Sequence, residues 1–172
     1  MKKIKFNPVS VFGKYPTFYI LDGYIYIIIK NTILPEYNQY FKIIKTPKSL
    51  SYMIMIGKIN KDKFKFHSNI PNLTLNQLYQ LVKFLYGIKD KKLTYGHFGD
   101  FLVKRNIVKK TPKNINHVKP QGRYKTSDIA YRAGITAQKT YCMITPYGIN
   151  YILNSSEIYM KNFIHKIKSI NS

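Results

Sequence analysis

The chain has 172 residues and a formal net charge of +22 at pH 7, from 29 lysines and arginines against 7 aspartates and glutamates. This length supports one sizeable hydrophobic core, or one small domain with extensions. The charge far exceeds what solubility requires, so we expect a polyanionic partner, most commonly nucleic acid. A merely basic soluble protein and a protein bound to an acidic membrane surface are the alternatives that composition leaves open.

The kinds of residue narrow this expectation further. Arg105, Arg123 and Arg132 are the only arginines, so lysine supplies almost all of the positive charge. Lysine binds phosphate as a point charge, whereas reading guanine favours arginine. We therefore expect contact with the nucleic-acid backbone rather than with base edges. The abundance of Lys, Ile, Asn and Tyr indicates an A/T-rich genome, as in many organelles, in A/T-rich bacteria and in their phages.

Sorting signals and cysteine content indicate the compartment. The single cysteine, Cys142, excludes an internal disulfide framework and a multi-cysteine zinc site, and it fits a reducing compartment. The basic start of the chain leads into Asn7-Pro8 rather than into an apolar signal segment. The longest apolar stretch, 19–29, is broken by Asp22-Gly23 and is too short to span a bilayer.

Two hairpins are predicted in the first third of the chain. Residues 1–17 form a basic arm, in which two prolines and a glycine prevent regular structure. Apolar runs at 18–21 and 24–29 flank Asp22-Gly23, a dipeptide suited to a two-residue type I′ turn. In 32–56, a turn at Pro35, a strand at 40–44, a turn at 46–48 and a return strand at 51–56 predict a second hairpin. Its basic residues are Lys42, Lys45 and Lys48.

A lysine-rich segment and a helix follow. In 57–69, Phe64 and Phe66 alternate with lysines. The two phenylalanines either stack on exposed bases while the lysines hold phosphate, or belong to an ordinary strand and pack inward. A helix is predicted at 74–85, because Thr74 and Gln77 form a capping box, Gly87 provides a stop signal, and leucines repeat at helical spacing.

The most intimate nucleic-acid contact is predicted at 96–105. Gly96 and Gly99 would let the backbone approach a phosphate, His97 would donate a hydrogen bond, and Lys104 and Arg105 would add charge. Catalysis or metal binding by His97 is the alternative, but the sequence shows no carboxylate pair beside it. We therefore expect no catalytic residue, no metal site and no cofactor.

The last third is predicted to be an extension. Residues 109–132 are basic and rich in turn residues, which predicts an extended tail along nucleic acid, with Lys109, Lys110 and Lys113 as contacts. A short helix is predicted at about 157–167, preceded by Ser155 and Ser156 as capping residues. The expected organisation is a basic arm at 1–17, a core at 18–110 with an inserted helical region at 57–93, and a linker and extension at 111–172.

Two motifs resemble the family of small-subunit ribosomal protein nineteen. The segment T-I-L-P-E-Y at 32–37 is similar to the family's S-T-I-L-P-E-F, and the hairpin after it matches without a gap. G-H-F-G-D-F at 96–101, with basic residues behind it, is similar to the family's G-H-K-F-G-E-F but lacks one residue. The resemblance covers roughly 30–110, with an insertion inside it, and nothing after about Pro112 has a counterpart.

The resemblance implies a structural role without a reaction. It implies an α+β fold, a small antiparallel sheet of hairpins with a packed helix, bound to small-subunit ribosomal RNA in the subunit head and supporting translation. Small-subunit ribosomal protein thirteen is the implied neighbour, lineage-specific proteins would bind the insertion and the extension, and no membrane is involved. Asp100 would order its loop. The implied location is the mitochondrial matrix, and the absence of an Arg-rich presequence favours an organelle gene.

A regulator of DNA is the main alternative. The segments 101–108 and 141–148 together resemble a winged-helix DNA-binding domain, as in the C-terminal domains of phage antirepressors. In this interpretation Lys-Arg-Asn-Ile-Val ends a recognition helix, and a wing strand leads to a helix that starts with Thr-Pro-x-Gly. An enzyme is the third alternative, but no nucleophile motif or glycine-rich phosphate loop supports one.

Overall fold

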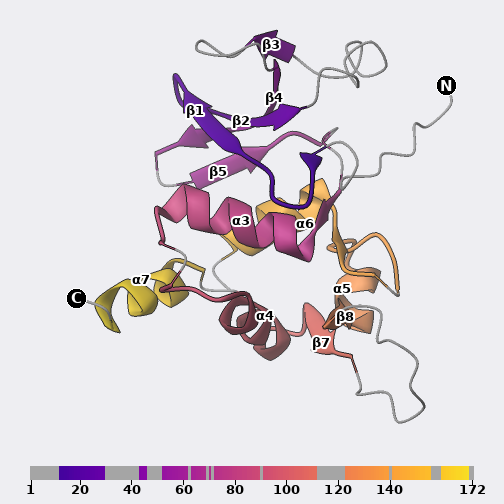
Figure 1. Cartoon of the computed structure of the whole chain (residues 1–172). Helices are drawn as coiled ribbons and strands as arrows, with labels where there is room; N and C mark the ends of the chain where they lie inside the picture. Colours follow the sequence, from indigo (N-terminus) through magenta and orange to yellow (C-terminus); the bar gives the residue numbers. More distant parts are fainter. Residues whose placement is uncertain are drawn as a thin grey trace, which may run out of the picture.

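The computed structural model describes most of the chain, in segments separated by short gaps. The described residues are 12–29, 43–45, 52–61, 63–68, 70, 72–89, 91–111, 123–139, 141–155 and 160–170. Within them the fold is mixed α+β, with antiparallel sheets and five helices, which confirms the predicted class. A sheet forms one layer, two helices lie against it, and further helices and a hairpin lie beyond these two (Figure 1). Within the described segments, no helix is long and apolar enough to cross a bilayer.

The first predicted hairpin is confirmed. Strands β1 (Phe18–Leu21) and β2 (Tyr24–Ile29) pair in antiparallel register around Asp22 and Gly23. Both turn residues have positive φ, 51° and 79°, as a type I′ turn requires. Glycine adopts this conformation without strain, and aspartate tolerates it better than most residues.

The second hairpin is confirmed in its described part. Strand β3 (Ile43–Lys45) pairs antiparallel with β4 (Tyr52–Asn60), with Ile43 opposite Ile54. The predicted turns at Pro35 and 46–48 lie outside the described residues. Strand β4 also pairs with β2 along one edge and with β5 (Lys63–Phe66) at the end of the other. It is therefore the central strand of a five-stranded sheet.

Strand β5 decides between the two predictions for the lysine-rich segment. Phe64 and Phe66 are buried in the core, while Lys63 and Lys65 are exposed. The packed-strand prediction is confirmed, and the prediction that these phenylalanines stack on bases is wrong. Neighbouring side chains in a strand point to opposite faces of the sheet, and the face that carries the two phenylalanines packs against the core.

The helix predicted at 74–85 is observed as α3 (Leu75–Tyr86), and it follows directly from β6 (Leu73–Thr74). Thr74 Oγ1 accepts a hydrogen bond from Gln77 N at 3.1 Å, and Thr74 N donates to Gln77 Oε1 at 3.0 Å. Gly87 ends the helix with φ 62°. These contacts confirm the capping box and the glycine stop.

A second strand–helix unit lies beside the first. Strand β9 (Met143–Ile144) pairs antiparallel with β6 and runs directly into α6 (Pro146–Asn154). Both α3 and α6 lie under the same face of the five-stranded sheet (Figure 1). The core between them contains Ile25, Ile54, Leu78 and Ile149, all essentially inaccessible to solvent. The C-terminal part of the chain therefore completes the core.

Two asparagines of α6 close the free edge of β5. Asn150 Oδ1 accepts a hydrogen bond from Phe66 N at 2.8 Å, and its Nδ2 donates to Phe66 O at 3.2 Å. Asn154, one helical turn later, makes the same pair of bonds with Phe64. A spacing of four residues in a helix therefore matches a spacing of two residues in the strand. The exposed backbone groups of an edge strand are thus satisfied by side chains.

The predicted extended tail at 109–132 is wrong for its described residues. They contain β7 (Val108–Lys110), β8 (Tyr124–Thr126) and α5 (Asp128–Arg132). Buried Tyr124, Thr126 and Ala130 explain this folding, because each strand or helix contributes side chains to the core. The predicted C-terminal helix is observed, slightly displaced, as α7 (Met160–Ile170), which inserts Met160 and Ile164 into the core.

Candidate nucleic-acid interface

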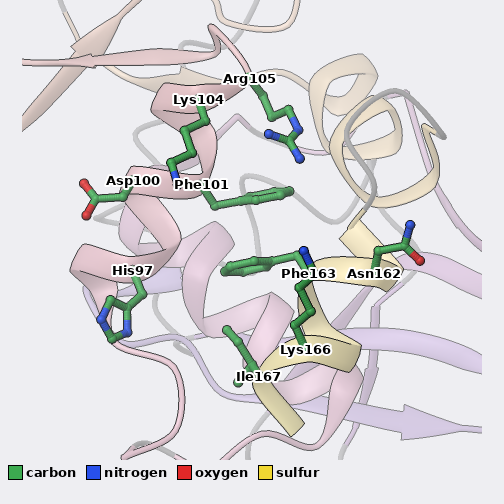
Figure 2. A pocket seen from close by; sticks show the side chains of 9 residues that line it. All are labelled: His97, Asp100, Phe101, Lys104, Arg105, Asn162, Phe163, Lys166 and Ile167. Atoms are coloured by element: carbon green, nitrogen blue, oxygen red, sulfur yellow. The ribbon is translucent and has the colours of Figure 1, made fainter. Parts of the chain in front are cut away.

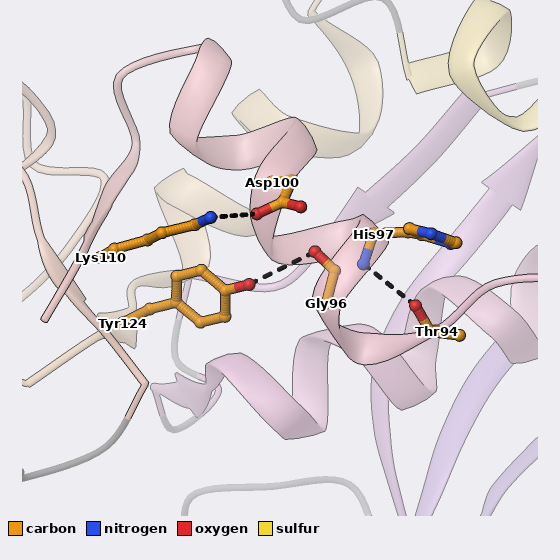
Figure 3. Close-up of polar contacts among 6 residues, drawn as sticks. All are labelled: Thr94, Gly96, His97, Asp100, Lys110 and Tyr124. Atoms are coloured by element: carbon orange, nitrogen blue, oxygen red, sulfur yellow. Dashed lines mark hydrogen bonds and ion pairs between the residues drawn. The ribbon is translucent and has the colours of Figure 1, made fainter. Parts of the chain in front are cut away.

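The segment predicted to approach phosphate as a loop is a helix, α4 (Tyr95–Lys104). Thr94 caps it by accepting a hydrogen bond from His97 N at 3.1 Å (Figure 3). Phe98 and Leu102 are fully buried on its inner side. The low helix propensity of its two glycines predicts against a helix at this position. The cap Thr94 and the helical spacing of Phe98, Phe101 and Leu102 were the signals that could have predicted it.

The two glycines of α4 serve packing. A Cβ on Gly99 would lie 2.5 Å from Cε2 of Tyr124 and closer still to other ring atoms. A Cβ on Gly96 would meet the guanidinium of Arg123 at 3.0 Å, and Gly96 O accepts a hydrogen bond from Tyr124 Oη at 3.3 Å (Figure 3). The prediction that the backbone is open to a phosphate is therefore wrong at Gly99, because Tyr124 of β8 fills that space, while at Gly96 the space holds the end of the Arg123 side chain.

Strands β7 and β8 form an antiparallel hairpin that rests on α4. Lys109 stands opposite Lys125, and Lys110 stands opposite Tyr124. Lys110 Nζ lies 3.4 Å from Oδ1 of Asp100 (Figure 3), with both side chains about half exposed. Such a solvated ion pair contributes little to stability. Asp100 was expected to order a loop; it instead links α4 to the hairpin.

On its other side α4 faces α7 across a cleft of about 650 Å³ (Figure 2). The rings of Phe101 and Phe163 stack with centroids 4.2 Å apart, and the Arg105 guanidinium lies 5.0 Å from the Phe101 centroid on the opposite side. His97 and Lys104 of α4 and Lys166 of α7 line the opening. The stacked rings hold the two helices together, and the charged groups remain at the rim.

These elements bring together only part of the predicted site. His97, Lys104 and Arg105 lie on or directly after α4, and Lys109 and Lys110 lie on β7. Lys45 lies on β3, in the sheet on the far side of α3 and α6 (Figure 1). Lys42, Lys48 and Lys113 lie outside the described residues. Several cations of this region were not predicted as contacts from the sequence, namely Arg123, Lys125 and Lys166. The alternation of basic residues with Tyr and Thr at 123–126 was the sequence signal for β8, which carries Lys125 and follows Arg123 directly.

We call the exposed side of α4 and the β7–β8 hairpin the basic interface; it consists of His97, Lys104, Lys109, Lys110, Arg123 and Lys125. Asp100 is its one carboxylate among the described residues, and it faces Lys110. At the start of α4, burial raises the pKa of Tyr95 to about 12, so this ring stays neutral and packs against Tyr79 and Tyr124. The interface is thus positive above a neutral aromatic layer.

Cys142 lies close to this aromatic layer, and burial raises its pKa to about 12 from the usual 9.0. At pH 8 this difference lowers the thiolate fraction about a thousandfold, and only the thiolate reacts readily with a disulfide reagent. We expect labelling of the native protein to be slower than labelling in urea by a factor of this order. Because the folded thiol stays neutral while the unfolded thiol ionises, the shift also lowers stability as pH rises above 9.0. Equal labelling rates with and without urea would contradict this account.

Within the described residues, no three histidine, cysteine, aspartate or glutamate side chains gather as a metal site would require. Comparison of the chain with family models, with curated proteins and with solved structures finds no match.

Proposed function

We propose that this chain is a DNA-binding protein of winged-helix type that holds duplex DNA at the basic interface. The observation that carries the proposal is the packing of Tyr124 against Gly99, which docks the hairpin on α4 and brings the cations of both elements into the same region of the molecule. Lys110 lies on the hairpin face that meets α4, and Lys109 and Lys125 lie on the opposite face. The order of elements supports it, because helix α3 is followed by helix α4 and then by the hairpin, which takes the place of the wing.

Binding would rest mainly on phosphate neutralisation. Lys109 and Lys125 stand side by side on the hairpin, and their mutual repulsion is relieved when a polyanion lies across them. Lys104 and His97 are exposed on the adjoining helix and would contact the same duplex. Lys166 of α7 would hold the backbone at the other rim of the cleft. The excess of lysine over arginine favours backbone contact over base reading.

Binding to small-subunit ribosomal RNA, which the resemblance implies, is the competing function. That expectation relied on the T-I-L-P-E-Y segment at 32–37, which lies outside the described residues, on the hairpin after it and on the G-H-F-G-D-F segment at 96–101. Within the last of these, Gly96 and Gly99 were expected to approach a phosphate from a loop. Gly99 is explained by its packing against Tyr124 of β8, which weakens this support for an RNA contact. The predicted hairpin at β3 and β4 remains, but a hairpin alone does not favour ribosomal RNA over DNA.

The test compares two triple variants with the same change in charge. Replacing Lys109, Lys110 and Lys125 by Ala should weaken binding to a labelled duplex at least tenfold at about 0.1 M salt. The slope of log affinity against log salt should fall by about 2.7, because each lost phosphate contact contributes about 0.9. The matched control replaces Lys58, Lys63 and Lys65, which lie on the sheet, and should leave duplex affinity within about twofold.

Two results would overturn the proposal. One is an equal loss of duplex affinity in both triple variants, which would show that affinity depends only on the net charge of the protein. The other is sedimentation of the native protein with the small ribosomal subunit and its RNA, which would establish the competing function.

A further inference from the structure

We propose that the end of the sheet's outer face formed by Tyr24, Lys58 and Lys65 is a second site, which binds single-stranded nucleic acid. The strand register places three side chains in one row across three strands. Tyr24 of β2 stands opposite Lys58 of β4, and Lys58 stands opposite Lys65 of β5. The adjacent row contains Ile59 and Phe64, which face the core. The first row therefore points away from α3 and α6.

This row is accessible to a ligand. Lys58 and Lys65 are exposed, and 42% of the Tyr24 surface is open to solvent. Tyr19 of β1 lies further along the sheet and is 38% exposed. Lys63, two residues before Lys65 on the same face, adds a third cation about 7 Å along the strand.

The lysines on this face favour the binding of an anion. Lys58 and Lys65 are directly opposite in an antiparallel pair, where like charges destabilise a sheet. In the part of the chain that the structure describes, no ion pair is formed by Lys58, Lys63 or Lys65. A polyanion laid across the strands would relieve this repulsion. The opposed lysines Lys58 and Lys65 thus form a surface suited to phosphates.

The tyrosines specify the kind of polyanion. An exposed ring can stack on a base only when that base is unpaired, because the faces of duplex bases are covered by their neighbours. Lysines that hold phosphates beside rings that stack on bases are the combination that binds single strands. The rings come from β1 and β2 and the lysines from β4 and β5, so the site exists only when the strands pair.

The two surfaces lie on opposite sides of the molecule's helical layer. The inner face of the sheet packs against α3 and α6, and the basic interface lies beyond these helices (Figure 1). One molecule could therefore hold a duplex at the basic interface and a single strand at the sheet. This second site does not depend on the proposed function, because none of its residues belongs to the basic interface.

The experiment uses the full chain and a labelled oligo(dT) of about twelve nucleotides, within the range that single-strand binders cover. The variant in which Lys58, Lys63 and Lys65 are replaced by Ala should lose at least tenfold in affinity for oligo(dT). The hairpin variant at Lys109, Lys110 and Lys125 should retain its affinity for oligo(dT) within about twofold, while it loses duplex binding. Equal affinity of the sheet variant and the unmodified protein would overturn the second site, and duplex binding would still report separately on the proposed function.

Two further variants separate binding from folding and test stacking. Lys65→Glu creates an opposite-charge pair with Lys58, so it should raise the melting temperature while it weakens oligo(dT) binding. Loss of affinity with a lowered melting temperature would count against the site. The chain has no tryptophan, so Tyr24→Trp introduces a single reporter. Oligo(dT) should quench its fluorescence, and unchanged emission at saturating oligonucleotide would exclude stacking.

Discussion

Replacing Gly148 by alanine should lower the free energy of unfolding by about 3 kcal/mol, at the upper end of what overpacking costs. Gly148 lies in the first turn of α6, within the Thr-Pro-x-Gly segment. A Cβ at this position would fall 2.9 Å from the carbonyl carbon of Ile135 and closer still to its oxygen. Backbone, unlike a flexible side chain, cannot turn away. The midpoint of urea unfolding, followed by circular dichroism, measures the effect.

The Ile135 carbonyl is fixed because it belongs to the cap of α6. It accepts hydrogen bonds from Thr145 N at 3.0 Å and from Thr145 Oγ1 at 3.1 Å, and Thr145 Oγ1 in turn accepts one from Gly148 N at 3.0 Å. Thr145 and Gly148 thus act together: the threonine binds the neighbouring segment, and the glycine makes room for it. Moving Ile135 away would break the two hydrogen bonds that Thr145 donates to its carbonyl, each worth about 1 kcal/mol.

Gly96→Ala is the matched control, since it also places a methyl group on a glycine in the first turn of a helix. There the Cβ would meet only the guanidinium end of Arg123, at 3.0 Å. A long side chain can shift, and alanine gains about 1 kcal/mol in helix propensity. We expect a change of less than about 1 kcal/mol. If both alanine variants unfold at the same urea concentration, the close approach of Ile135 is not what requires Gly148.

Removing the two asparagines of α6 should have the second large effect. Asn150→Ala and Asn154→Ala each delete two hydrogen bonds to β5, worth about 1 kcal/mol apiece, and alanine returns about 0.5 kcal/mol in helix propensity. We expect a loss of about 1.5 kcal/mol for each variant and about 3 kcal/mol for the double variant. Urea unfolding measures the total.

Hydrogen exchange locates this effect within the sheet. The amide protons of Phe64 and Phe66 should exchange faster in the double variant, because they lose their acceptors, while amides shared by β2 and β4 should stay protected. Asn76→Ala is the control, since Asn76 makes one exposed hydrogen bond, to Lys14 O at 2.8 Å. It should change stability by less than about 0.5 kcal/mol. Uniform loss of protection across the sheet would contradict a local role for the asparagines.

Elements with local signals were predictable from sequence. The Asp22-Gly23 turn, the Thr74–Gln77 capping box and the alternation of Phe64 and Phe66 with lysines each act over a few residues, and each is observed as predicted. The excess of lysine is likewise a property of composition alone. These features need no partner from elsewhere in the chain, because a turn, a cap and an alternating strand are set by neighbouring residues.

The candidate sites depended on tertiary structure. Gly96 and Gly99 indicated an open loop, but Tyr124, far along the chain, fills the space that the glycines leave. The packing of α6 on the sheet was missed for the same reason, because Asn150 and Asn154 acquire their role only beside the edge of β5. The sheet surface follows from register, which sets Tyr24 beside Lys58 and Lys65. Sequence by itself determined the local elements and the net charge. Packing between distant segments decided where the charged side chains gather, because backbone contacts and strand register are set only when those segments meet.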